Sequence, residues 1–259
     1  MNKVAFTIVL NGMPFIKDQY EIIPKIFDHW YIIEGVSKNI NCTRWCNPIA
    51  REYHENNLSV DGTRQFLDTI NKDKKITVIR KKNGDAWNGK VEMCNSFMHL
   101  VKDCLLMQVD VDEFWSESVL LDIFKYCKTH NNFDAMQFRC SFYLGNNLVV
   151  NGKNCYGDMD WDWWRLWMIG KHNNFISHEP PRIQNQKLVI HKNDTSKAGW
   201  TFDHFAYKYK HQLEFKEKFY GYKGAVNQWE QLNSLESYEN VFAEKYLKWI
   251  KTKCPIKKI

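Results

Sequence analysis

The alternation of apolar runs with helical patterns in the first 115 residues constrains the fold most strongly. Four runs suited to strands, VAFTIVL, WYIIE, KITVIR and CLLMQVDVDEFW, begin at residues 4, 30, 75 and 104. Segments between them, among them 13–27, 59–70 and 87–103, place apolar residues at helical spacing. Strands that alternate with helices are joined by right-handed crossovers into a largely parallel sheet. The sequence therefore predicts an α/β, Rossmann-like fold with a mostly parallel central sheet flanked by helices.

An acidic cluster ends the fourth run, where Asp110, Asp112 and Glu113 fall within four positions. In an extended chain side chains two apart share a face, so Asp110 and Asp112 are expected to project together from the carboxyl end of the strand. Two close carboxylates repel each other unless a cation lies between them. Because ligands bind beyond the carboxyl ends of parallel strands, Asn11 and Glu34 are expected to join them in one crevice.

The ligand chemistry of this cluster favours a hard divalent cation. Carboxylate oxygens suit Mg²⁺ or Mn²⁺ and suit soft metals poorly. An ion held by only one or two carboxylates keeps positions open for water and phosphate oxygens. The turn therefore predicts Mn²⁺ (or Mg²⁺) as cofactor and a diphosphate as ligand.

Composition limits the possible partners of the 259-residue chain. Its net charge of +6 is spread along the sequence, which argues against a nucleic-acid partner but would attract an anionic ligand. No apolar run approaches the ~18 residues of a membrane span, so we expect a cytoplasmic protein with at most peripheral membrane contact. The eight cysteines indicate reduced thiols. A zinc site of Cys42, Cys46 and His54 is the alternative.

Taken together, these motifs resemble the GT-A fold of nucleotide-sugar-dependent glycosyltransferases. TIVLNG (7–12) is similar to their first strand and nucleotide loop, YIIEG (31–35) to a second strand that ends in an acidic residue, WNGKVEMCN to the helix before the metal strand, and VDVDEFW to the Asp-x-Asp turn. The resemblance covers residues 1–115 and implies transfer of a sugar from a nucleoside diphosphate sugar, UDP-linked, to a hydroxyl of a glycan or glycoconjugate. It implies these nucleotide-sugar contacts: Leu10, Asn11, Glu34, Lys90, Asn95, Asp110, Val111 and Lys218.

A later tract, AGWTFDHFAYKYKHQLEFKEKFYGY (198–222), resembles the GlyTrp, His and Phe-x-x-Lys pattern of certain inverting transferases. Among these are enzymes related to the β-1,4-N-acetylglucosaminyltransferase that bisects N-glycans. The resemblance implies that His204 is a further metal ligand beside Asp110 and Asp112. It also implies that Lys216 or Lys218 neutralises the departing diphosphate.

An inverting reaction also needs a carboxylate that removes the proton of the acceptor hydroxyl. The candidates are Asp160, Asp162, Glu179 and Asp203, and the aromatic or Pro-bearing loops around them favour Asp162 and Glu179 as the catalytic residues. The neighbouring Trp163, Trp164 and Arg165 are expected to form an exposed ledge for the acceptor.

No repeat or composition break divides the chain, so we expect a single glycosyltransferase domain over residues 1–259. Residues 1–115 would bind the nucleotide sugar, and residues 116–259 the acceptor, through strands and loops across the sheet's edge and helices at 211–222 and 237–253. Two alternatives stay open. One is a metal-dependent nucleotidyl or phosphoryl transferase, which usually brings a Gly-rich phosphate loop that is not evident here. The other is a non-catalytic carbohydrate-binding protein, which would leave the acidic turn without a role.

Overall fold

The computed structural model of the protein describes residues 1–150, 163–170, 173–247, 250 and 253–258. The strands are β1 Asn2–Val9, β2 His29–Glu34, β3 Ile76–Arg80, β4 Cys104–Gln108, β5 Glu113–Phe114, β6 Ala135–Leu144, β7 Leu148–Val150, β8 Trp163–Ile169, β9 Phe175–His178, β10 Pro181–Ile183, β11 Val189–Ile190, β12 Thr201–Tyr207 and β13 Ile256–Lys258. The α-helices are α1 Phe15–Tyr20, α2 Ile23–Ile26, α3 Thr63–Ile70, α4 Lys90–Asn95, α5 Glu117–Thr129, α6 Lys192–Lys197, α7 Lys210–Phe219 and α8 Ala225–Asn233.

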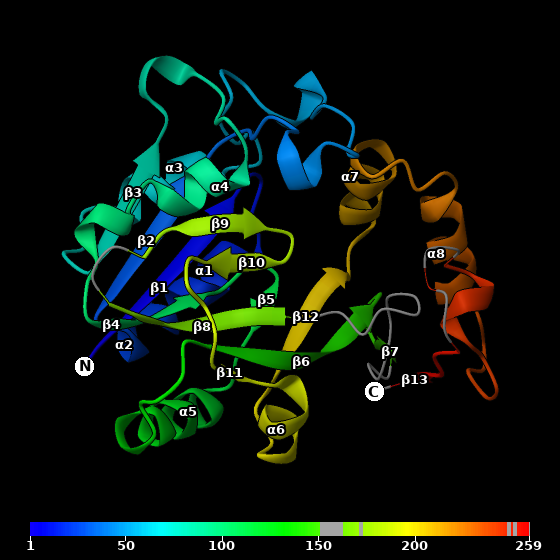
Figure 1. The fold of residues 1–259 in the computed structure, drawn as a ribbon. Helices are drawn as coiled ribbons and strands as arrows, with labels where there is room; N and C mark the ends of the chain where they lie inside the picture. Colours follow the sequence, from blue (N-terminus) through cyan, green and yellow to red (C-terminus); the bar gives the residue numbers. More distant parts are fainter. Residues whose placement is uncertain (151–162, 171–172, 248–249, 251–252, 259) are drawn as a thin grey trace.

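Both halves of the chain contribute to one sheet, which has 11 strands in the described residues and the order β13-β7-β6-β8-β4-β1-β2-β3 (Figure 1). Strands β11 and β12 also pair with β6, and β5 pairs with β12. Strands β4, β1, β2 and β3 are parallel, as the alternating sequence predicts. Strand β8 is antiparallel to β4 and β6 and lies between them. The predicted α/β, Rossmann-like fold is thus confirmed, whereas the single-domain organisation stays a prediction.

Alternate residues of the central strands feed two separate cores, because successive side chains of a strand point to opposite faces. Ala5 and Ile32 pack with buried residues of α2 and α5 on one face. Phe6 and Ile33 pack with α4 and β9 on the other face. Figure 1 shows α5 below the strands and α4 above them. The central strands are therefore buried on both faces of the sheet.

Two of the expected helices are shorter than their apolar spacing predicts. The segment 13–27 forms α1 and α2 instead of one helix, and Pro24 stands near the start of α2, where its missing N–H does no harm. In the segment 87–103, α4 begins after Gly89, whose φ of 93° is not helical, and ends at Asn95. A 3₁₀ turn at Met98–Leu100 follows.

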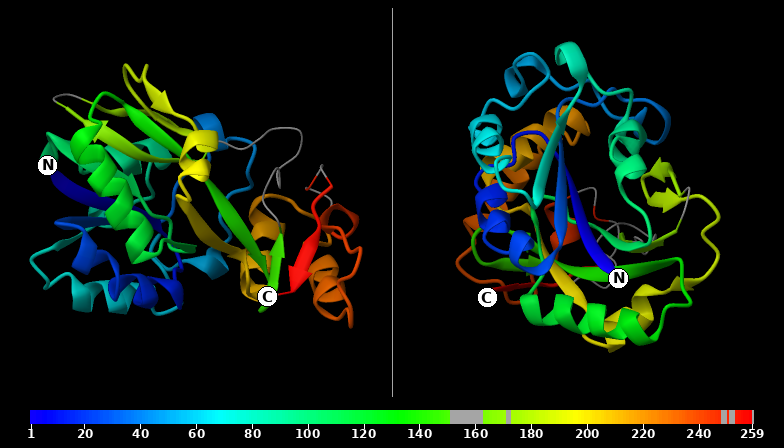
Figure 2. Two further views of the ribbon diagram at one scale, coloured as in Figure 1. Left: turned by 90° about the horizontal axis from the view of Figure 1, so that it is seen from below. Right: turned by 90° about the vertical axis from the view of Figure 1, so that its left-hand side faces the viewer.

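The C-terminal region lies at the end of the molecule away from the N-terminus (Figure 2). The helix expected at 211–222 is present as α7, but α8 was not predicted. The helix expected at 237–253 is wrong for the described residues, which contain only a 3₁₀ turn at Ala243–Lys245. Asn240 takes a left-handed φ of 58°, which a helix interior does not accommodate. Among the described residues, no helix is long and apolar enough to cross a membrane.

Candidate active site

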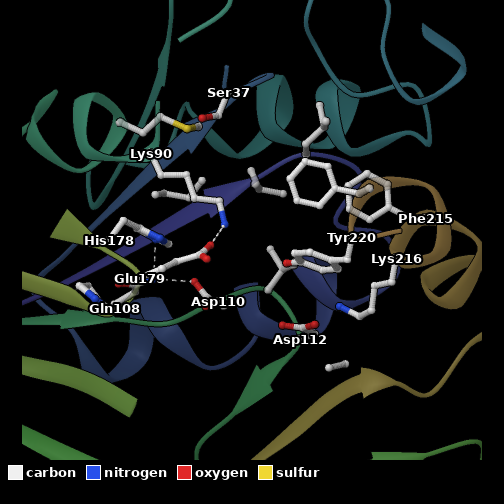
Figure 3. Close-up of a pocket in the computed structure, with 18 of the residues that line it drawn as sticks. Ser37, Lys90, Gln108, Asp110, Asp112, His178, Glu179, Phe215, Lys216 and Tyr220 are labelled. Carbon is white, nitrogen blue, oxygen red and sulfur yellow. Dashed lines mark hydrogen bonds and ion pairs between the residues drawn. The ribbon is translucent and has the colours of Figure 1, made fainter. Parts of the chain in front are cut away.

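A pocket opens at the carboxyl ends of β1 and β4, where the sheet topology predicts a ligand site. Its volume is about 400 Å³, within the range of roughly 300–1,000 Å³ typical of small-molecule sites. The first half of the chain contributes Leu10, Lys90, Gln108, Asp110, Val111 and Asp112 to its lining. The second half contributes Trp163, Arg165, Glu179, His204 and Lys216. Figure 3 shows Lys90, His178 and Glu179 near Asp110, with Lys216 and Tyr220 near Asp112.

The sequence predicts that Asp110, Asp112 and Glu113 end an extended strand. In the structure Asp110 and Asp112 lie instead in a turn after β4, and Glu113 begins β5. The strand ends at Gln108, and the Glu113 amide then donates to the Asp110 carbonyl at 3.0 Å. Thr7 on β1 donates to the Val109 carbonyl at 2.6 Å, and Gln19 on α1 donates to the carbonyls of Asp110 and Glu113 at 2.7 and 3.1 Å. These contacts fix the turn from behind, so the Asp110 and Asp112 side chains still reach the pocket.

Arg165 on β8 closes the inner side of this turn. Its Nε lies 2.8 Å from Glu113 Oε2, and its Nη2 lies 2.5 Å from Glu113 Oε1 and 3.1 Å from Asp110 Oδ2. The Glu113 side chain is completely buried, and burial raises its pKa to about 7 although Arg165 opposes the shift. Burial would lower the pKa of Arg165, but the two carboxylates raise it. Arg165 therefore carries the charge that keeps this cluster together.

His178, a buried histidine at the end of β9, lies next to this cluster. Gln108 Nε2 donates to Asp110 Oδ1 at 2.9 Å and lies 3.4 Å from His178 Nε2. Burial lowers the pKa of His178 well below its usual value, and the charges of Lys90 and Arg165 lower it further. The ring is therefore neutral, and the sequence analysis missed it although it immediately precedes Glu179.

Asp112 and His204 meet on the side of the turn that faces the pocket. Strand β12 pairs with β5 so that His204 stands opposite Glu113, and the Phe205 amide donates to the Asp112 carbonyl at 2.7 Å. His204 Nε2 lies 3.4 Å from Asp112 Oδ1. Burial would raise the pKa of Asp112, but His204 and Lys216 lower it to about 2.

The side chains of Asp110, Asp112 and His204 decide whether a divalent cation fits this pocket. Within the described ranges, no three His, Cys, Asp or Glu side chains are close enough to hold a metal ion together. Asp110 is engaged by Arg165 and Gln108, so Asp112 and His204 are the pair best placed to share an ion. Mg²⁺ and Mn²⁺ sites of this kind take few protein ligands and complete their coordination with water and substrate oxygens. The residues fit an ion of that type.

Two lysines enter the pocket from different helices. Lys90 at the start of α4 forms an ion pair with Glu179, with Nζ 2.8 Å from Oε1. Burial would lower the pKa of Lys90, but Glu179 raises it. Lys216 on α7 places its ammonium 5.3 Å from the Tyr207 ring centroid and 5.7 Å from that of Tyr220. Burial lowers the pKa of Lys216, and Asp112 and Asp110 offset part of that shift.

Lys218, which the sequence analysis assigned to the nucleotide sugar, lies outside the pocket. Its side chain is 54% exposed and pairs with Glu52 on the surface. Residues two apart on a helix do not share a face, so Lys216 and Lys218 cannot both point into one site. Lys216, the other lysine considered for the diphosphate, lines the pocket.

Three other predicted nucleotide contacts are engaged elsewhere. Glu34 is fully buried, accepts from the Ser59 amide at 3.2 Å and pairs with Arg80 at 2.6 Å. The Asn11 side chain bonds the Tyr53 carbonyl and the Val60 amide, at 2.6 and 2.8 Å. The Asn95 side chain bonds both backbone groups of Phe175, at 2.8 and 2.9 Å. In this structure these side chains hold loops and a strand in place, whereas Leu10 and Val111 do line the pocket.

The expected aromatic ledge is not formed. Trp163 lines the pocket, but Trp164 faces the opposite side of β8 and is only 5% exposed, within the core that contains Phe6. Arg165 is committed to the acidic turn, with its guanidinium 4.9 Å from the Trp163 ring centroid. The reason is the two-residue period of a strand, which separates neighbouring side chains.

Of the four carboxylates considered as a catalytic base, Glu179 lies in the pocket. Asp203 shares a hydrogen bond with Tyr143, and burial raises the pKa of this aspartate. It precedes His204 on β12 and so points to the other face of that strand. Asp160 and Asp162 lie outside the described residues.

The chain matches no known family model, and no curated protein matches its sequence. Among solved structures it is similar to TarS 1-349 of S. aureus, with 14% identity, a TM-score of 0.37, and coverage of 56% of this chain and 37% of that one. For TarS 1-349 in complex with UDP-GlcNAc the identity is 12%, the TM-score 0.40 and the coverage 65% and 45%. For a further TarS structure they are 11%, 0.40, 65% and 28%. The chain spans less than half the length of each TarS chain, and likeness at this level does not establish a shared function.

Proposed function

We propose that this protein is a glycosyltransferase that moves a sugar from a nucleoside diphosphate sugar, a UDP-sugar, to a hydroxyl of a glycan or glycoconjugate. The observation that carries the proposal is the meeting of Asp110, Asp112, Lys90 and Lys216 in one pocket at the carboxyl edge of a parallel sheet. Acidic oxygens and ammonium groups around one cavity are what a diphosphate bound with a divalent cation requires.

Different residues of the pocket would bind different parts of the donor and of its cation. Asp112 and His204 would hold Mn²⁺ or Mg²⁺, which when bound supplies positive charge next to the departing diphosphate. Lys216 lines the same pocket, and the charges of Asp112 and Asp110 raise its pKa. Its ammonium would therefore add positive charge beside the same phosphate oxygens. Lys90 would contact the phosphates from the opposite helix. Breaking the sugar–phosphate bond builds negative charge at these positions, and fixed cations there lower the barrier.

Glu179 is the residue that we assign to the acceptor. It stands at the turn between β9 and β10, and its side chain is 16% exposed toward the pocket. A carboxylate in that position can accept the proton of a hydroxyl that attacks the sugar carbon directly. If the diphosphate leaves from the opposite face in the same displacement, the sugar carbon is inverted. Its ion pair with Lys90, at 2.8 Å, fixes the position of its carboxylate. Asp162 stays a prediction.

The test is hydrolysis of a panel of nucleotide sugars, namely UDP-GlcNAc, UDP-glucose, UDP-galactose and GDP-mannose, with Mn²⁺, with Mg²⁺ and with EDTA. We expect slow sugar release from one donor that depends on the cation. Asp112→Asn should reduce this rate about 100-fold and weaken Mn²⁺-dependent UDP binding in calorimetry. The matched control is Asp194→Asn on α6, whose side chain is 63% exposed and does not line the pocket.

The outcome also separates the alternative classes. Consumption of nucleoside triphosphates in place of nucleotide sugars indicates a nucleotidyl transferase. Sugar binding without turnover of any donor indicates a carbohydrate-binding protein. Unchanged UDP binding and unchanged Mn²⁺ dependence in Asp112→Asn would contradict the proposed site.

A further inference from the structure

Tyr220 presents a hydroxyl to the pocket from the end of α7. Its amide donates to the Lys216 carbonyl at 2.8 Å, so the residue continues the last turn of the helix. Residues four apart on a helix share a face, and both side chains line the pocket. Figure 3 shows the Tyr220 hydroxyl pointing toward Lys90 and Glu179. The side chain is half-buried, and within the described ranges its hydroxyl has no hydrogen-bond partner.

The ring of Tyr220 is held in place by aromatic neighbours. Trp45 stacks on it with centroids 5.3 Å apart and planes at 21°, and Tyr222 does so with centroids 5.3 Å apart and planes at 28°. Phe219 packs against it at 67°, with centroids 4.8 Å apart. These contacts engage the ring, so the hydroxyl is the part of Tyr220 that is left for a ligand. Its position is fixed before binding, which reduces the entropy lost when a ligand arrives.

The hydroxyl of Tyr220 is a hydrogen-bond donor and not a base. Burial raises the pKa of Tyr220, and the charge of Lys90 offsets only part of that shift. The phenol therefore keeps its proton at neutral pH. A protonated phenol cannot take the proton of an acceptor hydroxyl, but it can donate to an oxygen that carries or gains negative charge.

Two ammonium groups approach the same space as this hydroxyl. The Lys216 ammonium is 5.7 Å from the Tyr220 ring centroid, and the charge of Lys90 acts on the Tyr220 hydroxyl. The ammoniums also act on each other, because the charge of Lys90 lowers the pKa of Lys216. A third lysine would increase this repulsion, whereas a neutral phenol adds a donor without adding charge. Three such donors suit an anion with several oxygens, as a diphosphate is.

We propose that the Tyr220 hydroxyl donates a hydrogen bond to the β-phosphate oxygen that leaves with the nucleotide. The inference rests on the proposed function and adds a neutral donor to Lys90 and Lys216. When the bond between this oxygen and the sugar carbon breaks, the electron pair stays on the oxygen, and the acceptor oxygen forms the new bond to the carbon. The acceptor proton goes to Glu179. Tyr220 keeps its own proton, and its hydrogen bond strengthens as the leaving oxygen gains charge.

The test is Tyr220→Phe, which removes the hydroxyl and retains the ring with its stacking partners. Calorimetry with Mn²⁺ measures the binding of UDP and UMP, which share base and ribose but differ by the β-phosphate. We expect the affinity for UDP to fall about tenfold and that for UMP to stay within about twofold. The leaving oxygen is esterified in a nucleotide sugar and charged only after cleavage. In donor hydrolysis kcat should therefore fall about tenfold, while KM changes by about twofold or less.

The matched control is Tyr126→Phe on α5, which removes the hydroxyl of a half-buried tyrosine that does not line the pocket. It should leave UDP affinity and kcat within about twofold of the wild type. Urea denaturation of both variants reports on a structural role. A lower midpoint in Tyr220→Phe with unchanged UDP affinity would overturn the proposed contact, because the hydroxyl would then serve the fold alone.

Further results would also overturn the contact. Equal losses of affinity for UDP and UMP would place the hydroxyl away from the β-phosphate, and a rise in KM at constant kcat would place it away from the leaving oxygen. Wild-type protein that binds no UDP would remove both the contact and the donor site. Donor turnover that Tyr220→Phe leaves unchanged removes the contact alone. Tyr220-dependent UDP binding without turnover of any nucleotide sugar removes the proposed function and leaves a diphosphate contact.

Discussion

The two sides of the acidic turn use the same residue types for different ends. On the inner side, Glu113 is completely buried and Arg165 is 3% exposed, so the two charges neutralise each other. On the pocket side, Asp112 keeps 18% of its side chain exposed, with His204 at 3.4 Å and Lys216 nearby. The same contrast separates the carboxylate of Glu34, which is fully buried beside Arg80, from that of Glu179, which is 16% exposed and faces the cavity. Among these carboxylates, access to solvent and not residue type distinguishes the framework from the candidate site.

Replacement of Arg165, the buried positive charge on the inner side of the turn, should have the largest effect on stability. Arg165→Met leaves Glu113 and Asp110 without the guanidinium that compensates them, so we expect the free energy of unfolding to fall by about 3–5 kcal/mol. Urea denaturation at pH 7.5 measures the loss. In the double variant with Glu113→Gln, part of the stability should return because one buried charge is gone.

The matched control for this variant is Arg182→Met. Arg182 is exposed on β10, and its guanidinium lies 5.5 Å from the Trp164 ring centroid. We expect a loss of less than about 1 kcal/mol from that contact. Equal losses of stability in Arg165→Met and Arg182→Met would show that Arg165 does not hold the acidic turn together. The inner and pocket sides of the turn would then not differ in their contribution to stability.

On the pocket side, exchange of a lysine should affect catalysis more than folding. Lys216→Met removes a positive charge beside the departing diphosphate, and we expect donor hydrolysis to fall about 10–100-fold. The urea midpoint should change little, because burial already disfavours this charge. Lys218→Met, two positions along the same helix, removes a 54%-exposed surface charge and should leave the rate within about twofold. A larger loss in Lys218→Met than in Lys216→Met would reverse the assignment of the two lysines.

Much of the fold was readable from local pattern. The runs that became β1, β2, β3 and β4 are apolar enough to be recognised singly, and their alternation with helices fixed the parallel order. From that order, the rule for carboxyl ends located the pocket. The insertion of β8 and β6 into the same sheet, by contrast, depends on antiparallel pairing between distant residues, such as Cys104 with Ile169 and Ala135 with Trp167, which no local pattern encodes.

Prediction of the site was limited by what tertiary contacts do to polar side chains. Asn11, Glu34 and Asn95 stand at the positions that motif and topology suggest, but Tyr53, Arg80 and Phe175 engage them, and each partner comes from a distant segment. That Trp163 and Trp164 share one ledge, or Lys216 and Lys218 one site, could have been excluded from sequence, because a strand alternates faces and a helix separates residues two apart.

The smallest predicted effect concerns the neutral histidine of the inner side. His178 stays deprotonated in the folded protein because burial lowers its pKa, whereas in the unfolded chain it takes up a proton below about pH 6.5. The unfolded state then binds more protons, so His178 should make stability fall as the pH drops below 6.5, by up to about 1.4 kcal/mol per pH unit. His178→Gln should remove this part of the slope between pH 6.5 and 5, measured by urea denaturation. His99→Gln, which changes an exposed histidine, should keep the wild-type slope. An unchanged slope in His178→Gln would mean that the folded protein admits a proton next to Gln108. The inner side of the turn would then be open to solvent like the pocket side.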